Sequence, residues 1–410
     1  MQTNIHPQLA RRADIIEADE ILRSCVHCGF CTATCPTYQL SSDELDGPRG
    51  RIYLIKNLLE DNAIEADSVV HLDRCLTCRA CETTCPSGVR YGRLLDIGKG
   101  LIAEKQVSSS WLRRLLIPLL RLVVPQPRLF RPLLQVGNLL RPLLPGFIRR
   151  HVPVLLNKSY VLPAIVARAP RVLVLQGCVQ KAATPQVNQA LAVLLAQQGV
   201  AVEFLPEESC CGSLDYHLAA HAAARRRMRR LIDQLYPRLS EVQAVVSTAS
   251  GCGVTLKEYA EIFADDPIYL AKAHQLHAKL RDVSELLAPY TFSCLPGRVA
   301  FHSPCTLQHG QKINGVVEDI LRRAGFELCA VQDAHLCCGS AGTYSLLQAD
   351  ISQTLLANKV ARLQAEQPDV IATANIGCQL HLQSGAAVPV VHWVELLADR
   401  LQAQPFKAVG

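Results

Sequence analysis

The sequence predicts a mixed α and α/β fold, in which a mostly helical domain with two cysteine-rich sites precedes a duplicated α/β domain with parallel sheets. Three observations predict this fold. Two cysteine runs of identical spacing lie near the N-terminus, among apolar residues at helical spacing. After residue 170, short apolar runs alternate with amphipathic stretches, which is the order of strands and crossover helices in a parallel sheet. That order recurs about 127 residues later, which indicates an internal duplication.

These changes divide the 410 residues into four segments. We expect a helical dicluster domain over residues 1–106 and a basic connector over 107–168. The two α/β repeats should then cover residues 169–295 and 296–410. A chain of this length can bury a sizeable core in more than one domain.

The first domain is organised around two runs, CVHCGFCTATCP and CLTCRACETTCP. Each has the spacing C-x2-C-x2-C-x3-C-P, by which two 4Fe-4S clusters are bound and the fourth cysteine of each run serves the other cluster. The predicted ligands are therefore Cys25, Cys28, Cys31 and Cys85 for cluster one, and Cys35, Cys75, Cys78 and Cys81 for cluster two. Structural zinc is the alternative, because C-x2-C pairs also bind zinc, but zinc does not explain a third and fourth cysteine in each run.

Helices are expected around both runs. Residues 1 to about 22 should form a helix that leads into the first run, and residues 51–62 have apolar positions at helical spacing. Residues 87–105 provide another amphipathic helix, which should close over the clusters. The cysteines would then lie in the connections between helices.

The connector is basic and rich in proline. Residues 111–150 carry eight arginines and no acidic residue, so the rest of the chain sums to −2 although the net charge is +6. Prolines should divide the segment into short helical pieces: Pro118, Pro125, Pro127, Pro132, Pro142 and Pro145.

Such basic amphipathic helices can lie on an anionic membrane surface, or they can simply pack between domains. The arginines expected to contact a membrane are Arg113, Arg114 and Arg121. Nucleic acid is a weaker partner because aromatic residues make up only 5% of the chain.

A second set of cysteines follows the predicted strands of the α/β repeats. The first quartet is Cys178, Cys210, Cys211 and Cys252, and the second, offset by 126 or 127 residues, is Cys305, Cys337, Cys338 and Cys378. Ligand sites of open α/β sheets lie at the carboxyl ends of the strands, so each quartet should converge. A further iron-sulfur centre, redox disulfides and buried structural thiols remain open. Nearby histidines could assist binding or proton transfer: His302, His309, His335 and His381. Cys294 and Cys329 lie outside the repeat and are expected to be packing residues.

The remaining sequence favours electron transfer. No G-x-G-x-x-G follows a predicted strand and no hydrolytic constellation is evident, so substrate oxidation should occur on another polypeptide. Eighteen cysteines without a visible signal peptide indicate a reducing, cytoplasmic location. No stretch reads as a convincing membrane span.

With these motifs in place, the chain resembles a known family. CVHCGFCTATCPTYQL, DELDGPRGRIYLIK, HLDRCLTCRACETTCPSGVRY and the paired CCGS turns closely resemble the iron-sulfur subunits of bacterial glycolate oxidase, a glycolate dehydrogenase. The N-terminal part resembles twin-cluster ferredoxin domains, and the repeats resemble the CCG domain of heterodisulfide reductases. The resemblance implies an FAD-bearing partner that oxidises glycolate to glyoxylate, a second flavin-type subunit, and a quinone or other acceptor at the cytoplasmic face of the inner membrane.

One departure from the CCG pattern limits this resemblance. That pattern ends in C-x-x-C, but Cys252 is followed by Gly253, Val254 and Thr255, and Cys378 by Gln379, Leu380 and His381. The five-cysteine chemistry of heterodisulfide reductases is therefore not expected, whereas a four-thiolate site is. The alternative functions are an iron-sulfur subunit of a lactate or glycerol-3-phosphate dehydrogenase, and a thiol-disulfide catalyst.

Overall fold

The computed structural model describes residues 1–107, 111–149, 152–155, 158–162 and 169–401. These residues form two compact units. The first unit contains Met1–Leu122, Leu214–Ala224 and His335–Lys359, and the second contains Val123–Ser213, Arg225–Ala334 and Val360–Gly410. Four helices include a point at which the chain passes between units: α7 (Trp111–Val123), α12 (Ser213–His217), α13 (His221–Leu235) and α20 (Ala349–Gln364).

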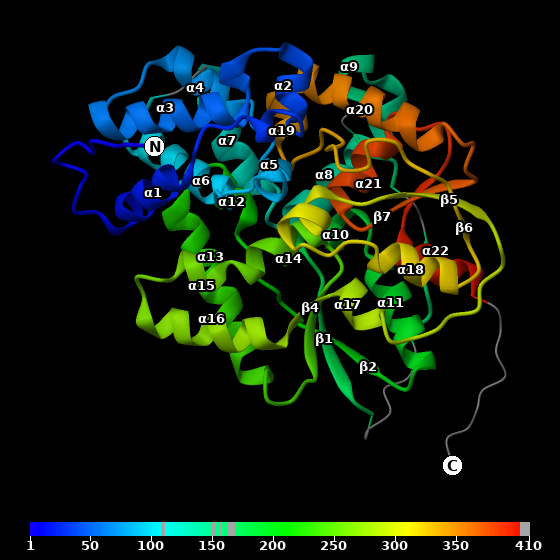
Figure 1. Ribbon diagram of the computed structural model, residues 1–410. Helices are drawn as coiled ribbons and strands as arrows, with labels where there is room; N and C mark the ends of the chain where they lie inside the picture. Colours follow the sequence, from blue (N-terminus) through cyan, green and yellow to red (C-terminus); the bar gives the residue numbers. More distant parts are fainter. Residues whose placement is uncertain (108–110, 150–151, 156–157, 163–168, 402–410) are drawn as a thin grey trace. The chain divides into compact units, whose positions relative to one another are not determined.

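The first unit is helical, as the sequence predicts, and its N-terminal part is blue to cyan in Figure 1. Its longer helices are α1 (Ala13–Ser24), α3 (Pro48–Asp61), α4 (Ala66–Asp73), α6 (Tyr91–Glu104) and α7 (Trp111–Val123). Short helices α2 (Pro36–Ser41), α5 (Ala80–Thr84) and α19 (Tyr344–Leu347) connect them. The apolar faces of α1, α3, α4 and α6 share one core, which includes Ile21, Leu22, Ile55, Leu58 and Leu94.

The helix expected over residues 1 to 22 is shorter than predicted. The structure has helix only from Ala13, because the preceding residues are held in other ways. The amide of His6 donates to the carbonyl of Leu59, and Leu9 and Ala10 both donate back to His6 in a turn. The N-terminal ammonium donates to the carbonyl of Cys25 at 3.0 Å, which places the start of the chain beside the first cysteine run.

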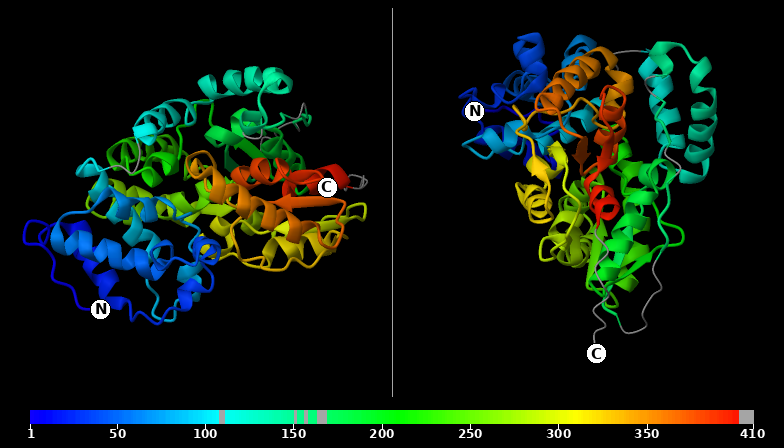
Figure 2. Two further views of the ribbon diagram at one scale, coloured as in Figure 1. Left: turned by 90° about the horizontal axis from the view of Figure 1, so that it is seen from above. Right: turned by 90° about the vertical axis from the view of Figure 1, so that its right-hand side faces the viewer.

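The second unit contains two parallel sheets, one from each α/β repeat. The first has the order β2-β1-β3-β4, formed by Ala201–Phe204, Arg171–Leu175, Ala244–Ser247 and Leu280–Asp282. The second has the order β6-β5-β7-β8, formed by Glu327–Leu328, Arg298–His302, Val370–Thr373 and Val390–His392. The identical order confirms the predicted duplicated α/β fold, although the sequence did not predict the short edge strands β4 and β8. Figure 2 shows the two sheets from two further sides, green for the first repeat and yellow to red for the second.

The two repeats exchange helix contacts in a reciprocal way. Helix α11 (Gln186–Gln197) of the first repeat packs against α22 (Trp393–Arg400) of the second, and α18 (Val316–Arg323) of the second packs against α17 (Val283–Leu287) of the first. One buried core therefore runs through both repeats, from Val172 to Trp393. The other helices of this unit are α8 (Pro127–Leu140), α9 (Gly146–Arg149), α10 (Cys178–Ala183), α14 (Ser250–Lys257), α15 (Tyr259–Ile262), α16 (Pro267–Lys279) and α21 (Ile376–Gln383).

The connector is less fragmented than its prolines predict. Pro118 lies inside α7 and Pro132 inside α8, so neither ends its helix. A proline removes the hydrogen bond to the carbonyl four residues earlier. Here those carbonyls belong to Arg114 and Arg128, which are both exposed, so water can satisfy them. Part of the connector lies outside the described residues. No helix in the described ranges combines the length and the apolar character that crossing a membrane requires.

Candidate functional site

The two cysteine runs fold into the same backbone turn. His27 and Gly29 have positive φ angles of 55° and 85°, and the equivalent Thr77 and Arg79 have 54° and 61°. Left-handed backbone at these two places reverses the chain between the first three cysteines of each run. Non-glycine residues adopt this conformation at a cost, so its repetition indicates a turn that the surrounding structure imposes.

The first of two cavities in this unit has about 440 Å³ of space, part of it open to solvent. Five of the predicted ligands line it: Cys25, Cys28, Cys31 and Cys85 of cluster one, and Cys81 of cluster two, which lines both cavities. Cys28 is exposed, whereas Cys25 is buried. Burial, with the neighbouring Cys25, raises the pKa of the Cys31 thiol to about 11. A thiolate here therefore requires a positive centre beside it, which a bound metal provides.

The second cavity has about 290 Å³ of space and is lined by Cys35, Cys75, Cys78 and Cys81. The structure thus brings together both sets of four cysteines that the spacing pairs, including the exchange of Cys35 and Cys85. Burial raises the pKa of Cys81 well above its usual range. Two sulfurs have polar neighbours: the Tyr91 hydroxyl donates to Cys75 Sγ at 3.5 Å, and Thr37 Oγ1 lies 3.3 Å from Cys35 Sγ.

The spread of these sulfurs fits a group larger than one ion. Among the described residues, no three of the eight Sγ atoms lie within 4.8 Å of one another. Zinc holds sulfur ligands at about 2.3 Å, which brings four of them close to one point. The cysteines instead surround two spaces, so the donor set fits a cubane better than zinc.

The first quartet of the α/β repeats also converges. Cys178 begins α10 after β1, Cys210 and Cys211 follow β2, and Cys252 lies in α14 after β3. The Sγ atoms of Cys178 and Cys210 are 3.6 Å apart. Either sulfur of this pair can be the donor, and hydrogen bonds with Cys178 and Cys211 lower the pKa of Cys210. Cys211 also contacts the Cys252 thiol, and the Cys210 contact, the Cys252 contact and burial together raise its pKa.

Two further groups, which the sequence did not single out, support this quartet. The Glu208 carboxylate accepts hydrogen bonds from the amides of Gln176 and Gly177 at 2.6 and 2.9 Å, and burial raises its pKa to about 7. The buried Tyr259 hydroxyl donates to the carbonyl of Cys211 at 2.7 Å. Glu208 therefore fastens the turn after β1 to the CCG turn, and Tyr259 orients that turn.

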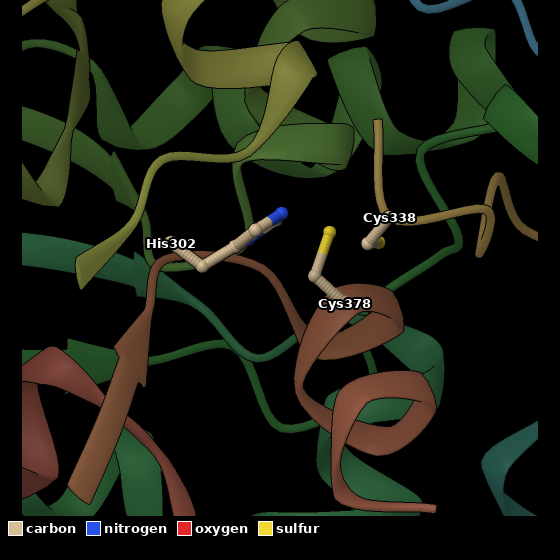
Figure 3. Close-up of side chains that lie close together, drawn as sticks. All are labelled: His302, Cys338 and Cys378. Atoms are coloured by element: carbon tan, nitrogen blue, oxygen red, sulfur yellow. The ribbon is translucent and has the colours of Figure 1, made fainter. Parts of the chain in front are cut away.

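The second quartet is divided between the two units. Cys305 and Cys378 belong to the second unit, where Cys378 lies in the first turn of α21 and the Asn375 amide is 3.6 Å from its sulfur. His302, at the end of β5, and Cys378 point into the same space (Figure 3), with ligand atoms within 4.8 Å. The predicted candidate His302 is thus placed beside a cysteine, and its Nδ1 is 3.1 Å from Thr373 Oγ1.

Cys337 and Cys338 are buried in the first unit. The amide of Gly339, whose φ is 89°, donates to Cys337 Sγ at 3.4 Å. A side chain at Gly339 would meet the carbonyl oxygen of Ser352 at 2.7 Å, so this CCG turn requires glycine. Cys294 belongs to the buried apolar core of the repeats, and its thiol donates to the carbonyl of Leu397 at 3.6 Å, as a packing residue can.

Two of the three connector arginines predicted to contact a membrane are engaged inside the first unit. Arg113 forms an ion pair with Asp73 at 3.1 Å, and Arg121 forms one with Asp215 at 2.6 Å. Asp215 is buried, so Arg121 compensates its charge. These ion pairs agree with the alternative that the connector packs against other parts of the chain, and a membrane contact of Arg113 and Arg121 stays a prediction. The spacing of leucines and arginines does not reveal the pairs because both partners lie far away in the sequence.

Comparisons with known proteins agree with this organisation. Residues 21–89 match the family described as 4Fe-4S dicluster domain, and residues 172–257 and 299–383 match the family described as cysteine-rich domain. These matches indicate that the chain binds iron-sulfur clusters. A crystal structure of a hypothetical protein from Helicobacter pylori covers 97% of this chain and 74% of its own, with a TM-score of 0.50 and 9% identity, and is similar in fold.

Curated relatives match over most of the chain. The glycolate oxidase iron-sulfur subunit of Escherichia coli (strain K12) is 48% identical over 98% of this chain and 100% of its own. The probable glycolate oxidase iron-sulfur subunit of Bacillus subtilis (strain 168) is 30% identical over 92% and 94%. Lactate utilization protein A of Geobacillus kaustophilus is 29% identical over 52% and 93%. The chain belongs to the family of glycolate oxidase iron-sulfur subunits.

Proposed function

We propose that this chain is the electron-transfer subunit of a complex that oxidises glycolate to glyoxylate. A partner with FAD removes two electrons from glycolate, a second flavin-type subunit accompanies it, and this chain passes the electrons singly to a quinone or another acceptor. The observation that carries the proposal is the pair of cavities, each lined by the four cysteines predicted for one cluster, from both runs, with Cys81 shared by both cavities. The identity to the Escherichia coli subunit over the whole chain supports the choice of glycolate.

The cofactors of the first unit are two 4Fe-4S clusters, each of which supplies a one-electron couple when bound. Cys25, Cys28, Cys31 and Cys85 hold cluster one, and Cys35, Cys75, Cys78 and Cys81 hold cluster two. The protein's own contribution is to bury these thiolates and to donate hydrogen bonds toward them. Tyr91 does so at Cys75, where its hydroxyl also excludes water.

The first quartet of the repeats holds one further iron-sulfur centre. Four cysteines from three strand ends converge there, which supports it. Hydrogen bonds of Glu208 and Tyr259 fix the backbone of the turn that carries Cys210 and Cys211, so its cysteines are held in place before a ligand binds. We assign no centre to the second quartet, because Cys305 and Cys378 alone belong to the second unit.

The exposed face of α8 supports the proposal that the complex lies at an anionic membrane surface, on the cytoplasmic side of the membrane. Leu129, Leu133, Val136 and Leu140 recur at helical spacing and are all exposed, by 43% to 56%. Arg128 and Arg131 on the same helix are exposed as well. An amphipathic helix with leucines and arginines of this kind binds a membrane interface through apolar burial and through attraction to anionic lipids.

The test is to produce the chain together with its flavoprotein partner and to add glycolate without oxygen. We expect iron-sulfur absorbance to bleach with glycolate and not with lactate or glycerol 3-phosphate, added in parallel. If lactate alone bleached the absorbance, the electron donor would be a partner that oxidises lactate, and the electron-transfer role of this chain would stand. A purified complex that contains zinc in place of iron would overturn the proposal.

A further inference from the structure

The two cavities of the first unit differ in charge. Helix α3 supplies a wall residue to each, Ile52 to the first cavity and Arg51 to the second. Arg51 is only 1% exposed, which is rare for an arginine. Close approach of α3 to the loop before it makes this burial possible: a side chain at Gly50 would meet the carbonyl oxygen of Glu44 at 2.1 Å.

Arg51 is held by three groups yet retains an unused donor. Its Nε donates to the carbonyl of His71 at 2.7 Å, and its Nη1 donates to Thr37 Oγ1 at 3.1 Å. Nη2 is buried and has no hydrogen-bond partner among the described residues. An orphaned N–H on a cavity wall is costly unless a ligand in the cavity accepts it. Thiolate and sulfide sulfurs of a bound cluster are such acceptors.

The charge of Arg51 is not fully neutralised by its surroundings. Asp46 Oδ1 is 3.7 Å from Nη2, but the same carboxylate forms an ion pair with Arg74 at 2.9 Å and contacts His71 at 2.9 Å. One carboxylate thus serves two guanidinium groups. Burial works against the charged form, but the thiolates of Cys75 and Cys35 help to raise the pKa of Arg51 above its usual range.

Among the described residues that line the first cavity, no arginine or lysine is buried. Its arginine, Arg49, forms an ion pair with Glu44 at 2.6 Å and is partly exposed, so its field is neutralised and screened. Water reaches this cavity at the exposed Cys28, but mobile dipoles stabilise added charge less than a fixed buried cation does.

We propose that Arg51 is the residue that raises the reduction potential at the second cavity above that at the first, and so sets the direction of electron transfer inside this unit. One electron, drawn from the reduced flavin of the partner, is added without a proton and without making or breaking a bond. It settles beside Arg51, because a nearby positive charge and an N–H donor favour the more negative, reduced form. This inference rests on the proposed cluster-binding function.

The experiment is a potentiometric titration of the full chain, loaded with clusters and followed by electron paramagnetic resonance. Arg51→Met removes the charge at similar length, and Arg51→Lys retains it. We expect Arg51→Met to lower the higher of the two midpoint potentials by at least the equivalent of a tenfold change in the ratio of reduced to oxidised form, which is about 59 mV for a one-electron couple. Arg51→Lys should lower it by less.

Arg49→Met is the matched control, because it removes an arginine two residues away that faces the first cavity. It should leave the higher potential unchanged. If Arg51→Met does not fold, Arg51→Gln tests the same point, since it also removes the charge and should shift the higher potential in the same direction. Iron content distinguishes failure of the cluster-binding proposal from failure of the Arg51 proposal. A wild-type chain that binds no iron would refute cluster binding. Loaded Arg51→Met protein with unshifted potentials would refute the role of Arg51 alone.

Discussion

The sulfurs of Cys178 and Cys210 lie 3.6 Å apart although the two residues are 32 positions apart in the sequence. A disulfide bond is about 2.05 Å long, so the two residues are present as thiols that could either bind a metal cluster or oxidise. Cys211 and Cys252 complete the group, which gives four sulfurs where a disulfide needs two. Measuring the iron content therefore distinguishes a bound iron-sulfur cluster from a disulfide.

Cys210→Ser should remove one centre from the anaerobically loaded chain and leave the twin-cluster unit intact. We expect a loss of about four irons of about twelve, the content of one cubane out of three. Iron and labile sulfide analysis measures this. Unchanged iron, with two more titratable thiols after reduction of the wild type, would indicate a redox disulfide at this place.

Cys28→Ser should abolish glycolate-driven reduction of the acceptor while the partner flavin is still reduced by glycolate. The substitution removes an exposed ligand of cluster one, and the chain then loses a link in the electron path. Stopped-flow absorbance separates flavin reduction from acceptor reduction. Cys294→Ser is the control, because that buried thiol lies in the α/β repeats and donates only to the Leu397 carbonyl. Normal turnover in Cys28→Ser would mean that electrons bypass cluster one.

Leu133→Asp together with Val136→Asp should release the chain from vesicles that contain anionic lipid. Burial of two such side chains is worth roughly 3 kcal/mol, so partitioning should fall about 100-fold. Vesicle flotation with and without anionic lipid measures this. Ile268→Asp, at a still more exposed apolar position on α16, should not change flotation. Equal loss in both variants would assign the binding to general hydrophobicity, and no loss would exclude α8.

His392 should make the stability of the second unit depend on pH. It is fully buried, caps α22 by accepting from the Val394 amide, and faces the Thr248 carbonyl at 2.9 Å through Nε2. Burial lowers its pKa to about 4 from the ordinary 6.5. The unfolded chain therefore binds the proton first as the pH falls. The stabilising contribution is complete above pH 6.5 and is lost between pH 6.5 and 4, in total about 3 kcal/mol.

His392→Asn keeps an acceptor for the Val394 amide but does not titrate in this range. Unfolding followed by circular dichroism at pH 7 and pH 5 should show a smaller loss of stability for the variant than for the wild type. Equal losses in both proteins would assign the acid sensitivity to other groups, such as the carboxylates in ion pairs.

Much of this organisation follows from local sequence. The spacing of cysteines in each run, together with Pro36 and Pro86, predicts the two-cluster arrangement because short turns and proline act through neighbouring residues. The near-constant offset between the quartets predicts two similar sheets, since strand and helix periodicity is also local. The family resemblance adds the partner and the substrate. The segment boundaries near residues 106, 168 and 295 stay predictions.

Tertiary structure alone decided the features that depend on distant residues. The burial of Arg51 beside the second cavity depends on how α3 packs against the loop at Glu44, and the pairing of Arg121 depends on Asp215, 94 positions away. The division of the second quartet between units arises because residues His335–Lys359 belong to the first unit. Short-range periodicity does not encode this assignment. The sequence by itself thus determined the cofactor class and the repeat, because spacing acts over a few residues. The charge around each cluster was decided only by packing, because the electrostatic environment is the sum of groups that folding brings together.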